Sequence, residues 1–66
     1  MRLTINGEPR EMTDTQTVRH LLQHLGFGEK PVVVEINQRA LFPREISDTL
    51  LHDGDVIEVV QITAGG

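Results

Sequence analysis

The sequence of 66 residues predicts a single α+β domain in which a mixed sheet of four to five strands packs on one helix. Three observations predict this class. Several short segments show the alternating or continuous apolar pattern of strands. One segment between them shows the apolar spacing of an amphipathic helix. The apolar residues are mainly aliphatic, with seven valines, seven leucines and five isoleucines against two phenylalanines, which suits a sheet covered by a helix.

A β-hairpin is predicted at the start of the chain. Residues 1–6 alternate between apolar and polar side chains, as a strand with one buried face does. Asn6-Gly7 follows, and this dipeptide favours the tight hairpin turn whose two central residues need positive φ. Residues 8–12 then return as the second strand. Because Pro9 has no N–H group to donate, this strand is expected at an edge of the sheet.

The helix is predicted from one apolar stripe at positions i, i+3, i+4 and i+7, formed by Val18, Leu21, Leu22 and Leu25. Thr17 is the expected N-cap, with Thr15 as a second candidate. Gly26 is placed to end the helix in a left-handed conformation.

Three further strands are predicted after the helix. Residues 32–37 form the third strand, with Val32, Val34 and Ile36 facing the helix. A turn at 37–39 leads to a short strand at 40–42. Residues 43–51 are expected to be irregular with a helical turn, and Leu50-Leu51 to close one end of the core.

A tight turn at 52–55 precedes the last strand, residues 56–62, which is the most apolar and is therefore expected to be central. A hairpin, one crossing helix and a final central strand beside the first strand constitute the β-grasp (ubiquitin-like) arrangement. Residues 1–62 are expected to form this domain, and residues 63–66 a flexible tail.

Charge and composition exclude several classes of function. The net charge is −4, and the six basic residues are scattered, which disfavours nucleic-acid binding. An acidic chain suits partners with positively charged docking surfaces, although plain solubilising charge explains the balance equally well. The chain has no cysteine, so disulfides and thiolate chemistry are excluded. No signal peptide or membrane span is seen, and cytoplasmic residence is expected.

No catalytic or metal-binding constellation emerges from the other polar residues. His20 and His24 have a spacing compatible with two metal ligands, but they fall opposite the apolar stripe and are expected to be solvated. His52 lies in a predicted turn, and Ser47 lacks the context of a nucleophile. Asp53 and Asp55 fit a turn better than a Ca²⁺ loop, and Gly26-Phe27-Gly28 is no phosphate loop.

The last residues, Ala64-Gly65-Gly66, are the remaining candidate. A pair of glycines alone is also compatible with a frayed end, but it follows the expected central strand directly. Glycines have no side chain to block a narrow channel and accept whatever φ and ψ a partner imposes. A carboxylate condensed with ATP becomes an acyl-adenylate, which a sulfur nucleophile converts to a thiocarboxylate. Because the chain has no cysteine for a persulfide, any sulfur that it carries belongs on Gly66.

Several segments together resemble the ThiS/MoaD ubiquitin-like family, and in particular its thiamine-biosynthesis sulfur carriers of the ThiS type. The segments are Gln16-Thr17-Val18 with Leu21-Leu22, Val34-Glu35-Ile36-Asn37-Gln38, Phe42-Pro43-Arg44-Glu45, Asp53-Gly54-Asp55-Val56-Ile57-Glu58 and Ile62-Thr63-Ala64-Gly65-Gly66. The resemblance covers essentially the whole chain.

The resemblance implies a co-substrate and not an enzyme. A ThiF-type enzyme adenylates Gly66 with ATP, which binds that partner, so that this chain itself holds no cofactor. Sulfur-transfer proteins then supply the sulfur, and the thiazole synthase ThiG consumes it. Gly66 carries the sulfur, while Gly65, Ala64 and Thr63 form the arm that delivers it.

A docking surface for partners is expected beside this tail. If Ile57 and Val59 face the helix, then Glu58, Val60 and Ile62 face outward, next to Val33 and Phe42. The alternative is that these residues pack under residues 43–51.

Three other functions remain open at this point. A carrier of the MoaD type shares the fold, the tail and the activation chemistry but serves molybdopterin or another sulfur-containing metabolite. A ubiquitin-like modifier attaches its terminal glycine to lysines of target proteins. A TGS-like binding module shares the fold and the Asp-Gly-Asp turn but needs no terminal glycines.

Overall fold

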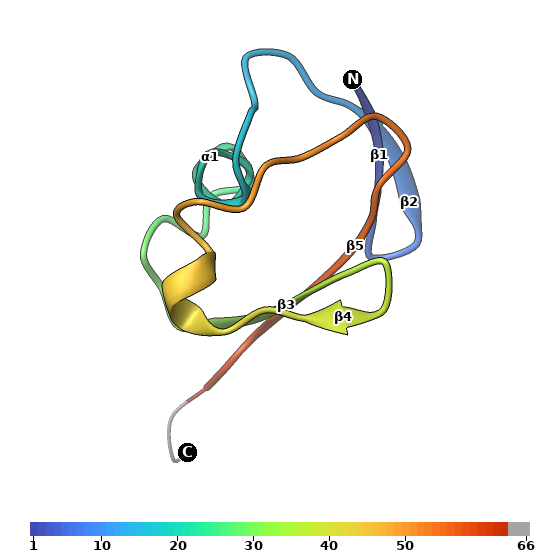
Figure 1. The fold of residues 1–66 in the computed structure, drawn as a ribbon. Coiled ribbons are helices and arrows are strands. Elements are labelled where there is room, and N and C mark those ends of the chain that lie inside the picture. The colour runs from blue at the N-terminus through green and yellow to red at the C-terminus, as the bar shows by residue number, and fades with distance from the viewer. Residues whose placement is uncertain (64–66) are drawn as a thin grey trace.

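The computed structural model describes residues 1–63, which form a five-stranded sheet with the order β2-β1-β5-β3-β4 and a helix on one face (Figure 1). The elements are β1 (Arg2–Ile5), β2 (Glu8–Glu11), α1 (Val18–His24), β3 (Val32–Ile36), β4 (Arg39–Ala40), the 3-10 turn η1 (Pro43–Glu45) and β5 (Val56–Gln61). Strands β1 and β5 run parallel and the other neighbours antiparallel. The predicted β-grasp fold with a mixed sheet is therefore confirmed. No helix within residues 1–63 is long and apolar enough to cross a membrane.

The N-terminal hairpin follows its prediction. Asn6 and Gly7 have φ values of 50° and 83°, which are the positive angles that this turn requires. Strand β2 lies at the edge of the sheet, and Pro9 stands opposite Thr4. The missing N–H group of Pro9 therefore costs the sheet no interior hydrogen bond.

Helix α1 begins and ends at the predicted residues. The hydroxyl of Thr17 accepts a hydrogen bond from the His20 N–H group at 3.2 Å, so Thr17 is the N-cap. The second candidate, Thr15, instead donates its hydroxyl to the Thr13 carbonyl within the preceding loop. Gly26 follows the helix at a φ of 89°.

The core lies between α1 and the inner face of the sheet. The helix contributes Val18, Leu21 and Leu22, all fully buried. The strands contribute every second residue, as their pleat requires. These are Leu3 and Ile5 from β1, Val34 from β3, and Ile57 and Val59 from β5. Full burial of a large aliphatic side chain contributes about 1.5 to 3 kcal/mol.

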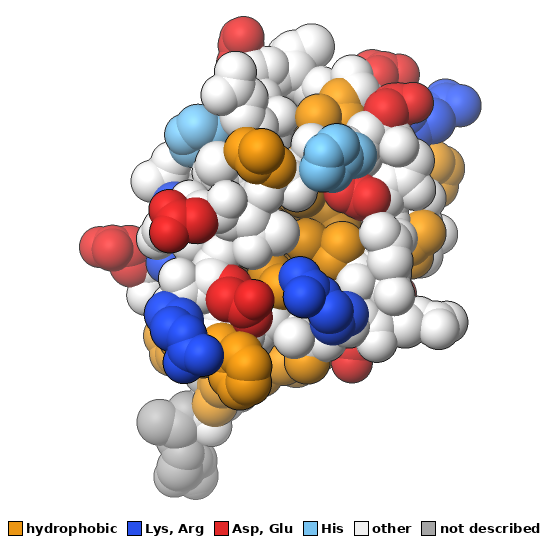
Figure 2. Space-filling view, viewed as in Figure 1, with side chains coloured by type: hydrophobic (Ala, Val, Ile, Leu, Met, Phe, Trp, Pro, Cys, Tyr) orange, Lys and Arg blue, Asp and Glu red, His pale blue; other side chains and the backbone are white. Residues whose placement is uncertain are grey.

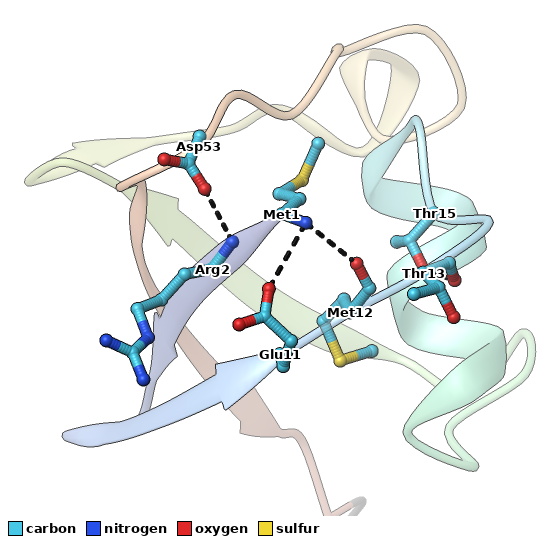
Figure 3. Close-up of polar contacts among 7 residues, drawn as sticks. All are labelled: Met1, Arg2, Glu11, Met12, Thr13, Thr15 and Asp53. Atoms are coloured by element: carbon cyan, nitrogen blue, oxygen red, sulfur yellow. Dashed lines mark hydrogen bonds and ion pairs between the residues drawn. The ribbon is translucent and has the colours of Figure 1, made fainter.

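The N-terminal end of β1 is fastened to both neighbouring segments (Figure 3). The Met1 ammonium group lies 3.3 Å from a carboxylate oxygen of Glu11 and donates to the Met12 carbonyl. The Arg2 N–H group donates to the Asp53 carboxylate at 2.6 Å. Strand β1 is thus held against β2 and against the turn that precedes β5.

Two predictions about the segment between β3 and β5 are wrong. The short strand expected at 40–42 is β4 at Arg39–Ala40, because the Phe42 N–H group bonds to the Glu45 carboxylate as η1 begins. Leu50 was expected in the core, but 59% of it is exposed, whereas Leu51 is only 5% exposed. Leu50 forms a β-bridge with Thr17, and adjacent residues of an extended segment point to opposite sides.

These neighbouring leucines give a matched test of the core. Leu51→Ala is expected to lower the free energy of unfolding by about 2 to 5 kcal/mol, because it leaves a cavity. Leu50→Ala removes the same atoms from a solvated position and is expected to change the free energy of unfolding by less than about 0.5 kcal/mol. Urea denaturation measures both values, and equal losses would contradict the placement.

Candidate functional site

The segment that leads to the candidate tail is held in the sheet through Ile62. Strand β5 pairs with β3 from Ile57, opposite Ile36, to Gln61, opposite Val32. One residue further, the Ile62 N–H group donates to the Pro31 carbonyl at 3.0 Å. Thr63 follows as an exposed residue. The predicted arm and carrier residues Ala64, Gly65 and Gly66 lie outside the described residues.

The other edge of β5 depends on the side chain of Asn6. Strand β1 pairs with β5 only at Thr4 and Ile5, since the chain turns away at Asn6. The Asn6 side-chain oxygen accepts from the Val59 N–H group at 2.8 Å, and its nitrogen donates to the Val59 carbonyl at 3.2 Å. The amide thereby replaces the backbone of a strand that has ended.

The Asn37 side chain likewise satisfies a backbone group at the start of β5. Its side-chain oxygen accepts from the Val56 N–H group at 2.9 Å, and its nitrogen donates to the Asp55 carboxylate at 3.0 Å. The second oxygen of that carboxylate accepts from the His52 N–H group. Both asparagines have a φ of 50°, as turn residues do. The sequence identified them only as turn residues, because nothing local indicates a bond to a distant strand.

The predicted outward face of β5 is exposed. Val60 is 61% exposed and Ile62 is 49% exposed, and Glu58 is also exposed. Val33 stands directly opposite Val60 and is 46% exposed, and Phe42 is 60% exposed. The alternative, in which these residues pack under residues 43–51, is therefore wrong. We call Val33, Phe42, Val60 and Ile62 the apolar patch. Hydrophobic side chains gather at the lower end of the view in Figure 2.

Phe42 is held in place by its own turn. The Arg44 guanidinium carbon lies 4.8 Å from the centre of the Phe42 ring, a cation–π contact. The Phe42 N–H group donates to the Glu45 carboxylate at 2.7 Å, and the Glu45 N–H group donates to the Phe42 carbonyl at 2.8 Å. The backbone of Phe42 is thus fixed by two hydrogen bonds, and its exposed ring contacts the Arg44 guanidinium, a contact that the sequence did not indicate.

Basic side chains lie beside the last described residues. A shallow groove of about 280 Å³ is lined by Arg19, Lys30, Pro43 and Ile62 among others. The Arg19 guanidinium also donates to the Gly28 carbonyl at 2.9 Å, which holds it against the loop after the helix. Glu29 lines the same groove, so two basic side chains and one acidic side chain adjoin the point where the chain leaves the sheet.

The histidines and Ser47, which the sequence analysis also considered, are exposed side chains. The exposure of His20, His24 and His52 is as expected of solvated side chains. Within residues 1–63, no cluster of three or more histidine, aspartate or glutamate side chains is arranged to hold a metal ion.

The chain matches the model of the ThiS family over residues 3–66. It is 40% identical to the sulfur carrier protein ThiS of Thermus thermophilus, over 94% of this chain and 95% of that protein. It is 36% identical to a thiazole synthase of Paramagnetospirillum magneticum, over the whole chain but only 20% of that protein. The crystal structure of ThiS from Geobacter metallireducens superposes with a TM-score of 0.83 at 32% identity, and all of both chains is covered.

The Asn6 clamp on β5 is tested by Asn6→Gly, which keeps the positive φ without strain and removes both side-chain bonds. We expect the free energy of unfolding to fall by about 1 to 3 kcal/mol, because the polar groups of Val59 lose their partners. Hydrogen exchange of the Val59 amide is expected to accelerate relative to the Ile57 amide, which faces β1. Unchanged protection of Val59 would contradict the clamp.

Proposed function

The chain belongs to the ThiS family of sulfur carriers, and we propose that the carboxyl group of Gly66 carries the sulfur used to form the thiazole of thiamine. The family match carries this proposal, because it extends over the whole domain and to Gly66 itself. The geometry agrees with it, since the central strand is fixed through Ile62 and the residues around its end are exposed and apolar.

The proposed chemistry has two steps. An oxygen of the Gly66 carboxylate attacks the α-phosphorus of ATP, and pyrophosphate leaves. The product is an acyl-adenylate, a covalent intermediate with a good leaving group. A sulfur nucleophile then attacks the carbonyl carbon, and AMP leaves with the bonding electron pair. If the nucleophile is hydrosulfide, Gly66 then ends directly in a thiocarboxylate. If it is a persulfide of a donor protein, the product is an acyl disulfide, and a thiol attacks the donor's sulfur, forms a disulfide with it and releases the Gly66 thiocarboxylate. ATP binds to the activating enzyme in this scheme, and this chain supplies the carboxylate.

Three kinds of partner follow from this chemistry: a ThiF-type adenylating enzyme, sulfur-transfer proteins and a thiazole synthase. The two thiazole synthases that resemble this chain support the last of these. Those of Paramagnetospirillum magneticum and Magnetococcus marinus each contain a segment similar to the whole chain, which makes up 20% of their length. A carrier-like segment joined to a thiazole synthase is the arrangement expected if carrier and synthase work together.

The chain acts in this proposal as a cytoplasmic co-substrate and not as a catalyst. Residues 1–62 form the recognised domain, and residues 63–66 deliver the reacting group. An extended segment of four residues spans about 13 Å, enough to place Gly66 inside a partner while the sheet stays outside. Thr63, Ala64 and Gly65 act as the arm, and Glu58 together with the apolar patch forms the docking face.

The carrier residue is tested by intact-mass spectrometry after incubation with ATP, a sulfur donor and the ThiF-type enzyme of the same organism. The full-length chain is expected to gain the mass difference between sulfur and oxygen. A chain lacking Gly66 is expected to gain nothing, because the altered end no longer fits the activating site. A full-length chain that is adenylated but never gains sulfur would contradict the carrier function.

The docking face is tested by Val60→Asp, with Leu50→Asp as the matched control. Both residues are about equally exposed, at 61% and 59%, but Leu50 lies outside the apolar patch. We expect Val60→Asp to weaken binding to the ThiF-type enzyme at least about tenfold, because it buries a charge in an apolar contact. Leu50→Asp is expected to leave binding unchanged. Equal effects of the two variants, with both domains folded by circular dichroism, would contradict the docking face.

A further inference from the structure

Two glutamates stand directly opposite each other on the outer face of the sheet. Glu35 of β3 and Glu58 of β5 are register partners, and both are exposed. Their neighbours Val34, Ile57 and Val59 are buried against the helix, so the two carboxylates share the opposite face. Like charges at directly opposite positions of a sheet destabilise it. The free domain therefore carries an unfavourable interaction at the centre of its exposed face.

Nothing in residues 1–63 neutralises this pair. Neither glutamate takes part in an ion pair there, and the strand neighbour of Glu35 on its other side is Ala40. The nearby Arg39 is the register partner of Ile36, whose side chain lies on the inner face, and both line a groove on that side. The two carboxylates thus stand side by side without an ion-pair partner within residues 1–63.

The glutamate pair adjoins the apolar patch. Val33 and Val60 form the next same-face pair toward the end of β5, and Val56 precedes Glu58 on the same face. A partner that covers this patch also removes water from the two carboxylates, which strengthens their repulsion. An apolar partner surface over the two carboxylates is therefore unfavourable, whereas a cation between them offsets the repulsion.

We propose that the ThiF-type adenylating enzyme docks on this face with an arginine that bonds to Glu35 and Glu58 together, while its apolar side chains cover Val33, Val60 and Phe42. This inference rests on the proposed function, which supplies the identity of the partner. A guanidinium group has five N–H donors in a planar fork and can serve two carboxylates at once, which a lysine ammonium group does less well. The partner thereby relieves a repulsion that the free carrier contains.

The same charges oppose a second copy of this chain as the occupant. A two-fold symmetric contact through this face brings the glutamate pair of one copy against the equivalent face of the other. Four carboxylates then gather at a dehydrated contact, while the basic residues of this face, Arg2 and Arg44, make no ion pair with either glutamate within residues 1–63. The pair thus disfavours self-association through the apolar patch and favours a cationic partner.

The test is the double variant Glu35→Gln/Glu58→Gln, which keeps the size of both side chains and removes their charges. Binding to the ThiF-type enzyme is measured by calorimetry without ATP, at low and high salt. We expect the dissociation constant to rise at least about tenfold at low salt and its salt dependence to become weaker. The urea midpoint of the free variant is expected to be equal or higher, since the repulsion is gone. A variant that binds more weakly although it is at least as stable shows that the glutamates act in binding. Loss of a purely structural contact would instead lower the stability of the free domain.

The matched control is Glu8→Gln/Asp14→Asn, which changes the charge equally at two exposed positions away from this face. Asp14 has a φ of 54°, which asparagine also tolerates. This control is expected to bind within about threefold of the original chain. Equal weakening by both double variants, or unchanged binding by Glu35→Gln/Glu58→Gln, overturns the inference. Because binding is measured without ATP, this outcome is independent of whether Gly66 later gains sulfur.

Discussion

The structure depends on satisfying the backbone of β5 along both edges. One edge is paired with β3 from Ile57 to Gln61, but the neighbour on the other edge, β1, turns away after Ile5. Asn6 closes this gap by bonding its amide to both backbone groups of Val59. The Asn37 side-chain oxygen accepts from the N–H group of Val56, the first residue of the strand, and the Val56 carbonyl accepts from the Asn37 backbone N–H group. The two turns at the ends of β1 and β3 thus fix the strand that leads to the proposed carrier residue.

The fixed register of β5 also determines which of its side chains enter the core and which remain exposed. Because successive side chains point to opposite faces, Ile57 and Val59 build the core while Glu58 and Val60 lie on the proposed docking face. A slip of one residue would exchange the two sets, so the register that stabilises the core also specifies the surface. Stability and recognition in this domain therefore share one constraint, the pairing of β5 with its neighbours.

The docking face combines attraction with selectivity. Its apolar residues supply the area that a partner can bury, with Arg44 against the Phe42 ring and Glu45 bonded to the Phe42 backbone. In the proposed docking, the opposed carboxylates of Glu35 and Glu58 disfavour a partner without a suitably placed cation, including a second copy of the chain. A carrier that must be handed from one enzyme to the next benefits from contacts that only the correct surfaces relieve.

Local patterns in the sequence determined the hairpin at Asn6-Gly7, the helix capped by Thr17, the alternation of β5 and the fold class. The terminal glycines and the absence of cysteine pointed to Gly66 as the carrier residue, and only resemblance pointed to the acceptor of the sulfur. Only the tertiary structure decided that Leu51 is buried and Leu50 exposed, and that Glu35 opposes Glu58. It alone joined Asn6 to Val59, 53 residues away. The physical reason is that periodicity reveals which side chains share a face of their own segment, whereas the partner of each residue across the sheet is fixed by topology and register.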